Sequence, residues 1–199
     1  LCDFIDELSR DSATPGGGSV SALSGALSAS LISMVANLSI SVKSVQKYSA
    51  KAQFIKDKLL NLVDKDAKAF DFVMKAFSLK KKTKDQQEKR SEEIENAYKK
   101  AIQPPLEILE FSNDLFYMIK MIQKDINSNC LSDLGVAIEM ASASSSGAIM
   151  NININFRQCG WDNLYHRMLV RNDHSINLEK IENFFRKILK KPIHDQSNY

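Results

Sequence analysis

The longest uncharged stretch of the chain constrains its fold more than any other feature. No Asp, Glu, Lys or Arg occurs between Asp11 and Lys43. A segment of this kind is either a membrane span or a helix surrounded by other helices. Its many serines, together with Asn37, make it too polar to cross a membrane alone. We therefore predict a long helix that begins at Ser19 and lies in the middle of a helical bundle, with no membrane segment.

Length and composition are those of an ordinary globular chain. The 199 residues are 44% hydrophobic and 26% charged, which predicts a single domain over residues 1–199 with a sizeable core. The net charge of +3 is too small to indicate nucleic-acid binding. The run Lys80–Lys84 has no stacking aromatics within it and is better explained as a solvated linker.

Cysteine and histidine usage indicates a cytoplasmic protein without a metal. Cys2, Cys130 and Cys159 are far apart in the sequence, which fits free thiols in a reducing compartment better than a disulfide framework. The three histidines occur late in the chain and show no metal-ligand spacing. We therefore expect a cytoplasmic location and no metal site.

Apolar residues elsewhere recur at steps of three and four, and no stretch alternates long enough for a confident strand. A second segment of small residues ends in Asn151–Asn155, which we predict to be helical. Pro104 and Pro105 should divide or kink the helix that contains them. The further helices that we predict cover residues 3–9 (packed over the glycine turn), 46–79, 87–124, 134–156 (capped by Ser132 and Asp133) and 178–188. The predicted fold class is all-α: an up-and-down bundle of several helices with two long, small-residue central helices.

The glycine turn, Thr14 to Ser19, leads straight into the first central helix. Its sequence is Thr-Pro-Gly-Gly-Gly-Ser. A tight turn delivered onto a helix N-terminus presents free N–H groups and the positive end of the helix dipole, which favour anionic or carbonyl-bearing ligands. A sharp turn followed by a serine cap explains the same residues without any ligand.

Three acids are candidates for chemistry. Asp66 falls in the gap of an apolar stripe, so it is either paired with a cation or exposed to a cleft where its pKa matters. If the stripe is rotated, Asp66 lies in solvent instead. Asp133 opens the second small-residue helix, where the dipole alone is enough to explain an acid. If the two central helices pack together, Asp133 and the glycine turn could face one cavity. Glu139 is either a further candidate or half of a buried ion pair.

Amides form a second group of candidates. Asn37, Asn151 and Asn155 occur in segments that otherwise avoid large polar groups. Asn151 and Asn155 share one face of a helix at i, i+4. Buried amides need partners, so these side chains either bind a ligand or cross-link helices, and cross-linking is somewhat favoured.

Several motifs in order resemble one enzyme family over essentially the whole chain. These are Pro15–Ser39, Leu62–Phe70, Pro105–Glu107, Asn129–Ala137 and Gly147–Asn155. Together they resemble the formiminotetrahydrofolate cyclodeaminase / methenyltetrahydrofolate cyclohydrolase family. The resemblance implies a helical bundle, a homodimer, and action on one-carbon derivatives of tetrahydrofolate without a metal or other cofactor. The chain departs from the family pattern at Asn153, where an arginine is common.

The resemblance also implies a reaction and a site. The cyclodeaminase joins N10 of 5-formiminotetrahydrofolate to the formimino carbon and releases ammonia, whereas the cyclohydrolase opens the methenyl bridge with water. A catalytically silent dimer that binds a folate or a protein is the alternative from another class. The expected catalytic residues are Asp133 and Asp66, in that order. The expected substrate-binding residues are Gly16, Gly17, Gly18, Ser19, Asn37, Lys43, Tyr48, Asn151 and Asn155.

Overall fold

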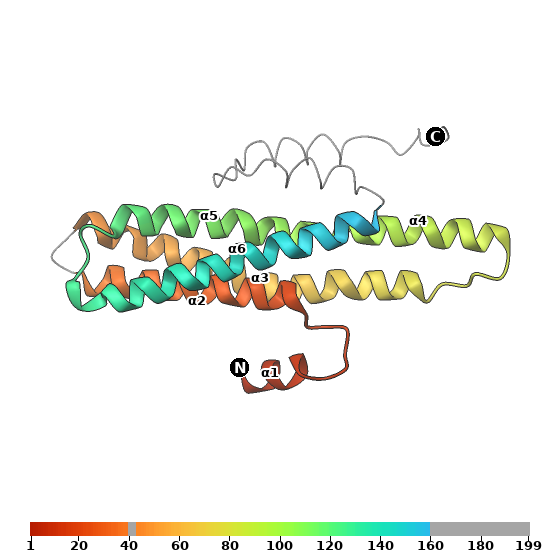
Figure 1. Cartoon of the computed structure of the whole chain (residues 1–199), viewed down its shortest axis with the longest axis horizontal. Coiled ribbons are helices and arrows are strands. Elements are labelled where there is room, and N and C mark those ends of the chain that lie inside the picture. The colour runs from red at the N-terminus through yellow and green to blue at the C-terminus, as the bar shows by residue number, and fades with distance from the viewer. Residues whose placement is uncertain (40–42, 160–199) are drawn as a thin grey trace. The chain divides into compact units, whose positions relative to one another are not determined.

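Every regular element that the structure describes is a helix (Figure 1). The structure is a computed structural model that describes residues 1–39 and 43–159. The helices are α1 (Cys2–Leu8), α2 (Gly17–Leu38), α3 (Lys43–Phe77), α4 (Lys84–Ala101), α5 (Gln103–Ile122), the 3-10 turn η1 (Ser128–Cys130) and α6 (Leu131–Gln158). The all-α prediction is confirmed. The predicted helix over 178–188, and with it the extent of the domain to residue 199, lies outside the described residues.

Among the described residues, α2, α3, α5 and α6 form the bundle. α2 packs mainly against α3 and α6, and α5 completes the bundle by contacting α2, α3 and α6. Successive long helices alternate in direction, with α4 and α5 following one another along the same line (Figure 1). The up-and-down arrangement is therefore confirmed. One consequence matters for the site: α2 and α6 lie side by side but run in opposite directions.

Small residues let α2 and α6 approach closely, as their composition predicts. A Cβ atom on Gly147 would collide with the side chain of Ser21, and one on Gly25 would lie 2.7 Å from Oγ of Ser144. The buried hydroxyls are satisfied across the same contact, because Ser28 donates to the carbonyl of Ala137 at 2.7 Å. The two predicted central helices thus pack on each other within one chain.

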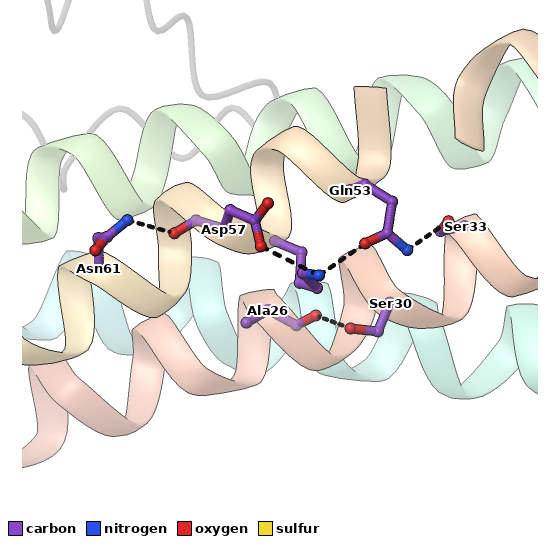
Figure 2. A network of polar contacts seen from close by, with 7 residues as sticks. Ala26, Ser30, Ser33, Gln53, Asp57 and Asn61 are labelled. Carbon is purple, nitrogen blue, oxygen red and sulfur yellow. Dashed lines mark hydrogen bonds and ion pairs between the residues drawn. The ribbon is translucent and has the colours of Figure 1, made fainter. Parts of the chain in front are cut away.

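The serines of α2 make the helix less polar than its sequence indicates. Figure 2 shows Ser30 bonded to the carbonyl of Ala26 in the same helix, and Gln53 of α3 reaching the hydroxyl of Ser33. By length and composition α2 is apolar enough to cross a membrane, yet 61% of its most apolar stretch is buried in the bundle. A buried core helix of a helical bundle is equally long and apolar.

Two helix starts and the packing of α1 differ from the prediction. α2 begins at Gly17 with Gly16 as its N-cap, so Ser19 is inside the helix. α6 begins at Leu131, which places Ser132 and Asp133 in its first turn rather than at its cap. α1 forms as predicted but has no buried residue, so its predicted packing over the glycine turn is not seen. The predicted division at Pro104 and Pro105 is confirmed, because α4 ends and α5 begins there.

Candidate functional site

The first turn of α2 receives its cap from another helix. The N-cap residue, Gly16, has no side chain to offer, so the free N–H groups of this turn need an acceptor from elsewhere. Asp66 of α3 accepts the backbone N–H of Ser19 and, at 3.2 Å, its hydroxyl. Ser19 is the third residue of α2, which is the position that an N-cap side chain normally serves. The carboxylate of Asp66, on α3, therefore caps the N-terminus of the neighbouring helix α2.

The glycine at position 18 makes room for this carboxylate. None of the glycines in the turn has a left-handed backbone, so their conformation alone does not require glycine. A Cβ atom on Gly18, however, would collide with the carboxylate of Asp66. The glycine turn thus exists, at least at Gly18, because an acidic group lies directly on the backbone of the helix start.

Burial raises the pKa of Asp66, and the two hydrogen bonds from Ser19 lower it by less. The hydroxyl of Ser19 has one hydrogen but lies near two acceptors, Asp66 at 3.2 Å and the carbonyl of Val63 at 2.9 Å. When Ser19 donates to Val63, a protonated Asp66 can donate to the Ser19 oxygen. Asp66 is thus placed to hold a proton and to release it. Its half-buried position rules out the solvent-facing alternative.

Asn151 of α6 lies on the other side of the turn. Its Nδ2 is 3.5 Å from the place that a Cβ atom on Gly17 would take, and it donates to the carbonyl of Gly147 at 2.8 Å. Asn151 therefore lies at the glycine turn, and its binding of substrate stays a prediction. Side chains of α3 and α6 therefore meet the backbone of α2 at one place, the glycine-turn site: Gly16, Gly17, Gly18, Ser19, Asp66 and Asn151.

One contact of this site was missed by the sequence analysis. The hydroxyl of Thr14 donates to Asp71 of α3 at 3.3 Å and so ties the segment before the turn to the helix that carries Asp66. Asp71 is exposed and follows Asp66 by five residues. Nothing in the periodicity of α3 distinguishes it from the other surface acids.

Asn155 has a structural role. Its side chain is 8% exposed, and Nδ2 donates to the carbonyl of Ala101 at 3.0 Å. In a continuous helix this carbonyl would accept from residue 105, but Pro105 has no N–H. The amide of Asn155 replaces the missing donor. The cross-linking alternative is therefore confirmed for Asn155, and its place among the substrate-binding residues stays a prediction.

The remaining predicted site residues gather at the opposite end of the bundle. We call this group, Asn37, Lys43, Tyr48 and Asp133, the Asp133 end. There α2 ends and α3 and α6 begin, and the backbone N–H of Asn127 donates to Ser39 at 3.0 Å, joining the segments.

The expectation that Asp133 and the glycine turn face one cavity is wrong within a single chain. Asp133 precedes Asn151 by eighteen residues of α6, roughly 27 Å at the rise of an α-helix. The central helices do pack together, as that expectation required, but they are antiparallel, so the start of one lies beside the end of the other.

The Asp133 end is open and polar. Asn37 and Lys43 are exposed, and Asp133 is partly exposed in the first turn of α6. The ammonium of Lys47 lies 5.2 Å from the ring centre of Tyr48. Glu139, farther along α6, is exposed, so its interpretation as half of a buried ion pair is wrong. Within residues 1–39 and 43–159 no group of three His, Cys, Asp or Glu side chains is arranged to hold a metal ion.

Comparisons with known proteins agree on one family. A family model described as formiminotransferase-cyclodeaminase matches residues 1–172. The methenyltetrahydrofolate cyclohydrolase of Methylorubrum extorquens is 33% identical over 159 residues, which are 76% of each chain. The formimidoyltransferase-cyclodeaminase of Gallus gallus is 31% identical over 161 residues, 77% of this chain but 30% of that protein. The crystal structure of formiminotetrahydrofolate cyclodeaminase from Thermotoga maritima matches with a TM-score of 0.73 and 25% identity, over 96% of this chain and 93% of that one.

Proposed function

Because the chain belongs to the formiminotransferase-cyclodeaminase family, we propose that it is a formiminotetrahydrofolate cyclodeaminase, which converts 5-formiminotetrahydrofolate to 5,10-methenyltetrahydrofolate and ammonia. The observation that carries the proposal is the placement of Asp66: a half-buried acid with a raised pKa, lying on the N-terminal turn of α2. Cyclodeamination needs a proton donor in such a place.

The cyclodeaminase reaction requires a general acid, and Asp66 is placed to be that acid. N10 of the folate attacks the formimino carbon and its proton passes to the formimino nitrogen, so that a tetrahedral carbon with three nitrogens, one of them an amino group, forms. The C–N bond to the formimino nitrogen then breaks, and this nitrogen leaves as ammonia only if it receives a proton. We assign that proton to Asp66 as general acid. Once ionised, its carboxylate is close to the methenyl cation that forms, and an anion there stabilises the cation.

The rest of the glycine-turn site would position the substrate. Free N–H groups at the start of α2 suit the carbonyl of a pterin ring, and the exposed Gly17 lets a flat ring approach the backbone. The amide of Asn151 lies beside Gly17, within reach of the same ring. This proposal uses Gly16–Ser19 and Asn151 of the predicted binding residues. It gives Asn155 no contact with the substrate.

Methenyltetrahydrofolate cyclohydrolase is the second candidate. The cyclohydrolase relative matches over 76% of both chains, whereas the formimidoyltransferase-cyclodeaminases are matched over only 30% of their length. In this reaction ionised Asp66 would accept a proton from the attacking water. The two candidates share a tetrahedral carbon between N5 and N10, and therefore one acid can serve either.

Two further parts of the proposal follow from the chemistry and from the cysteines. Both reactions make and break C–N or C–O bonds with proton transfer and no net oxidation, so we propose that the protein uses no cofactor. Cys2, Cys130 and Cys159 are free thiols. This supports a cytoplasmic location.

An assay with two substrates separates the candidates. The purified chain is supplied with 5-formiminotetrahydrofolate and, in a separate reaction, with 5,10-methenyltetrahydrofolate, while ammonia release and loss of the methenyl absorbance are followed. Release of ammonia supports the cyclodeaminase. Turnover of the methenyl compound alone supports the cyclohydrolase, and turnover of neither supports the silent folate- or protein-binding dimer.

A further inference from the structure

Ser19 differs from other buried serines of α2 in what its hydroxyl contacts. The hydroxyls of Ser21 and Ser28 each donate to one backbone carbonyl, both at 2.7 Å. The hydroxyl of Ser19 instead lies between two acceptors of α3, the carbonyl of Val63 at 2.9 Å and Oδ2 of Asp66 at 3.2 Å. A hydroxyl has one hydrogen, so it can donate to only one of these acceptors at a time.

The hydroxyl of Ser19 can change its acceptor by moving a hydrogen and no heavy atom. The shorter distance is to Val63, which favours the carbonyl while Asp66 is neutral. Once Asp66 is ionised the carboxylate attracts the hydrogen more strongly, because a hydrogen bond to a charged acceptor is about twice as strong as a neutral one. Ser19 is 0% exposed, so water cannot replace its hydroxyl as the donor. Ser19 can therefore respond to the charge of Asp66 by rotation of its O–H bond alone.

The two oxygens of Asp66 have different surroundings. Oδ2 faces the hydroxyl of Ser19. Oδ1 is the atom nearest to the place that a Cβ on Gly18 would take, so it lies over the backbone of the glycine turn. The next residue along this backbone, Gly17, is exposed and is where the proposed substrate approaches. Oδ1 is thus the oxygen from which a proton would be transferred to the substrate.

Charged side chains around Asp66 do not replace Ser19 in this role. Within the described residues α2 has no charged residue, α6 brings the neutral amide of Asn151 to the turn, and Arg157 in the last turn of α6 is exposed. Other charged groups of α3, α4 and α5 have bonds of their own: Lys65 with Glu107 at 3.5 Å, Lys99 with Glu95 at 2.8 Å, and Asp71 with Thr14 at 3.3 Å. Burial and the two bonds from Ser19 shift the pKa of Asp66, so a change at Ser19 should move this pKa.

We propose that Ser19 is the positioning residue for proton transfer by Asp66: its hydroxyl donates to Val63 while Asp66 is neutral and turns to Oδ2 as Oδ1 releases its proton. The step rests on the proposed function, because the substrate supplies the nitrogen that accepts this proton. The proton passes to the amino group of the tetrahedral carbon, the C–N bond breaks with its electron pair on that nitrogen, and ammonia leaves. Asp66 regains a proton from water. Ser19 keeps its own hydrogen throughout and stabilises the carboxylate as it forms.

The first test measures the kinetics of ammonia release by Ser19→Ala, which removes the hydroxyl and keeps the backbone N–H. We expect kcat to fall about 10- to 100-fold, the effect of one hydrogen bond to a charged group. KM for 5-formiminotetrahydrofolate should stay within about two-fold, because the buried hydroxyl does not reach the substrate. The lost bond favours the ionised form, so the pKa of Asp66 rises in the variant. The decline of kcat with rising pH should therefore move to higher pH.

Ser28→Ala is the matched control, since it removes an equally buried hydroxyl from the same helix. It should keep the wild-type kcat and pH profile. If Ser19→Ala has the wild-type pH profile, or if both variants lose kcat equally, the hydroxyl of Ser19 only supports the fold and the proposal is overturned.

The second test measures the free energy of unfolding at pH 4 and pH 8 and needs no substrate. Ser19→Ala should destabilise the chain more at pH 8, because the lost bond is to the ionised carboxylate. In an Asp66→Asn background the cost of Ser19→Ala should be the same at both pH values. A cost that does not depend on pH in the wild-type background, or that depends on it equally in both backgrounds, overturns the proposal. Inactivity of the wild type counts against the proposed function instead, and the unfolding measurement then decides the role of Ser19 alone.

Discussion

The carboxylate of Asp66 lies where a side chain on Gly18 would otherwise be. The acid of one helix thereby caps the backbone of another and is half-buried at the same time. A structural need and a chemical one are met by the same group.

Gly18→Ala should destabilise the protein. The added methyl group cannot be accommodated without moving Asp66 or separating α2 from α3, and overpacking of this kind costs about 1–3 kcal/mol. This loss of stability is measured as the change in the free energy of unfolding in urea. Gly135→Ala is the control, because a Cβ atom there meets nothing within 4 Å and should stabilise α6 by about 0.5–1 kcal/mol. Equal effects of the two changes would contradict the close contact at Gly18.

Asp66→Asn and Asp66→Ala should differ in stability. The asparagine keeps an oxygen that accepts the N–H of Ser19, so we expect it to melt near the wild-type temperature. The alanine removes the cap of α2, which costs about 0.5–2 kcal/mol. Thermal unfolding followed by circular dichroism compares them. If the alanine variant is as stable as the asparagine variant, Asp66 does not cap α2.

Asp66 should also make stability depend on pH in a definite direction. Because burial raises its pKa in the folded state, the folded chain binds this proton more tightly than the unfolded chain does. The resulting stabilisation is fully present below the unfolded pKa of about 4 and is lost as pH rises through the folded pKa. The difference in unfolding free energy between wild type and Asp66→Asn, measured from pH 4 to 8, should therefore shift in favour of the variant. A difference that stays constant, or shifts the other way, contradicts the raised pKa.

Asn155→Ala should affect the fold rather than substrate binding. It leaves the buried carbonyl of Ala101 without a donor, which costs about 1–3 kcal/mol. Asn153→Ala, on the same helix but half-exposed, should change stability by less than about 0.5 kcal/mol. Urea unfolding compares the two variants, and KM for the folate is measured on the folded fraction. A raised KM with unchanged stability would restore Asn155 to the binding site.

Much of the fold could be predicted because its signals are local. The charge-free run of α2, the three- and four-residue steps of α3, and the break at Pro104 and Pro105 each act over a few turns of one helix. The alternatives considered for Asn155 also included the cross-link between helices that the structure shows. The small residues of both central helices indicated, correctly, that they pack on each other.

The predictions that failed concern how the helices are placed relative to one another. Composition showed that α2 and α6 would meet, but it contains no information about their relative direction, and that direction separates Asp133 from the glycine turn. The cap of α2 was assigned to Ser19 because helix caps are usually local. Here the acceptor comes from Asp66, forty-seven residues later in the chain.

The central claim is that Asp66 supplies the proton in folate chemistry at the glycine turn. The most direct test measures ammonia release from 5-formiminotetrahydrofolate by Asp66→Asn and by Asp64→Asn, which removes an exposed acid two residues earlier on the same helix. We expect the first variant to lose about 10²–10⁴-fold in kcat and the second to retain wild-type turnover. An Asp66→Asn protein that releases ammonia at close to the wild-type rate would contradict the account.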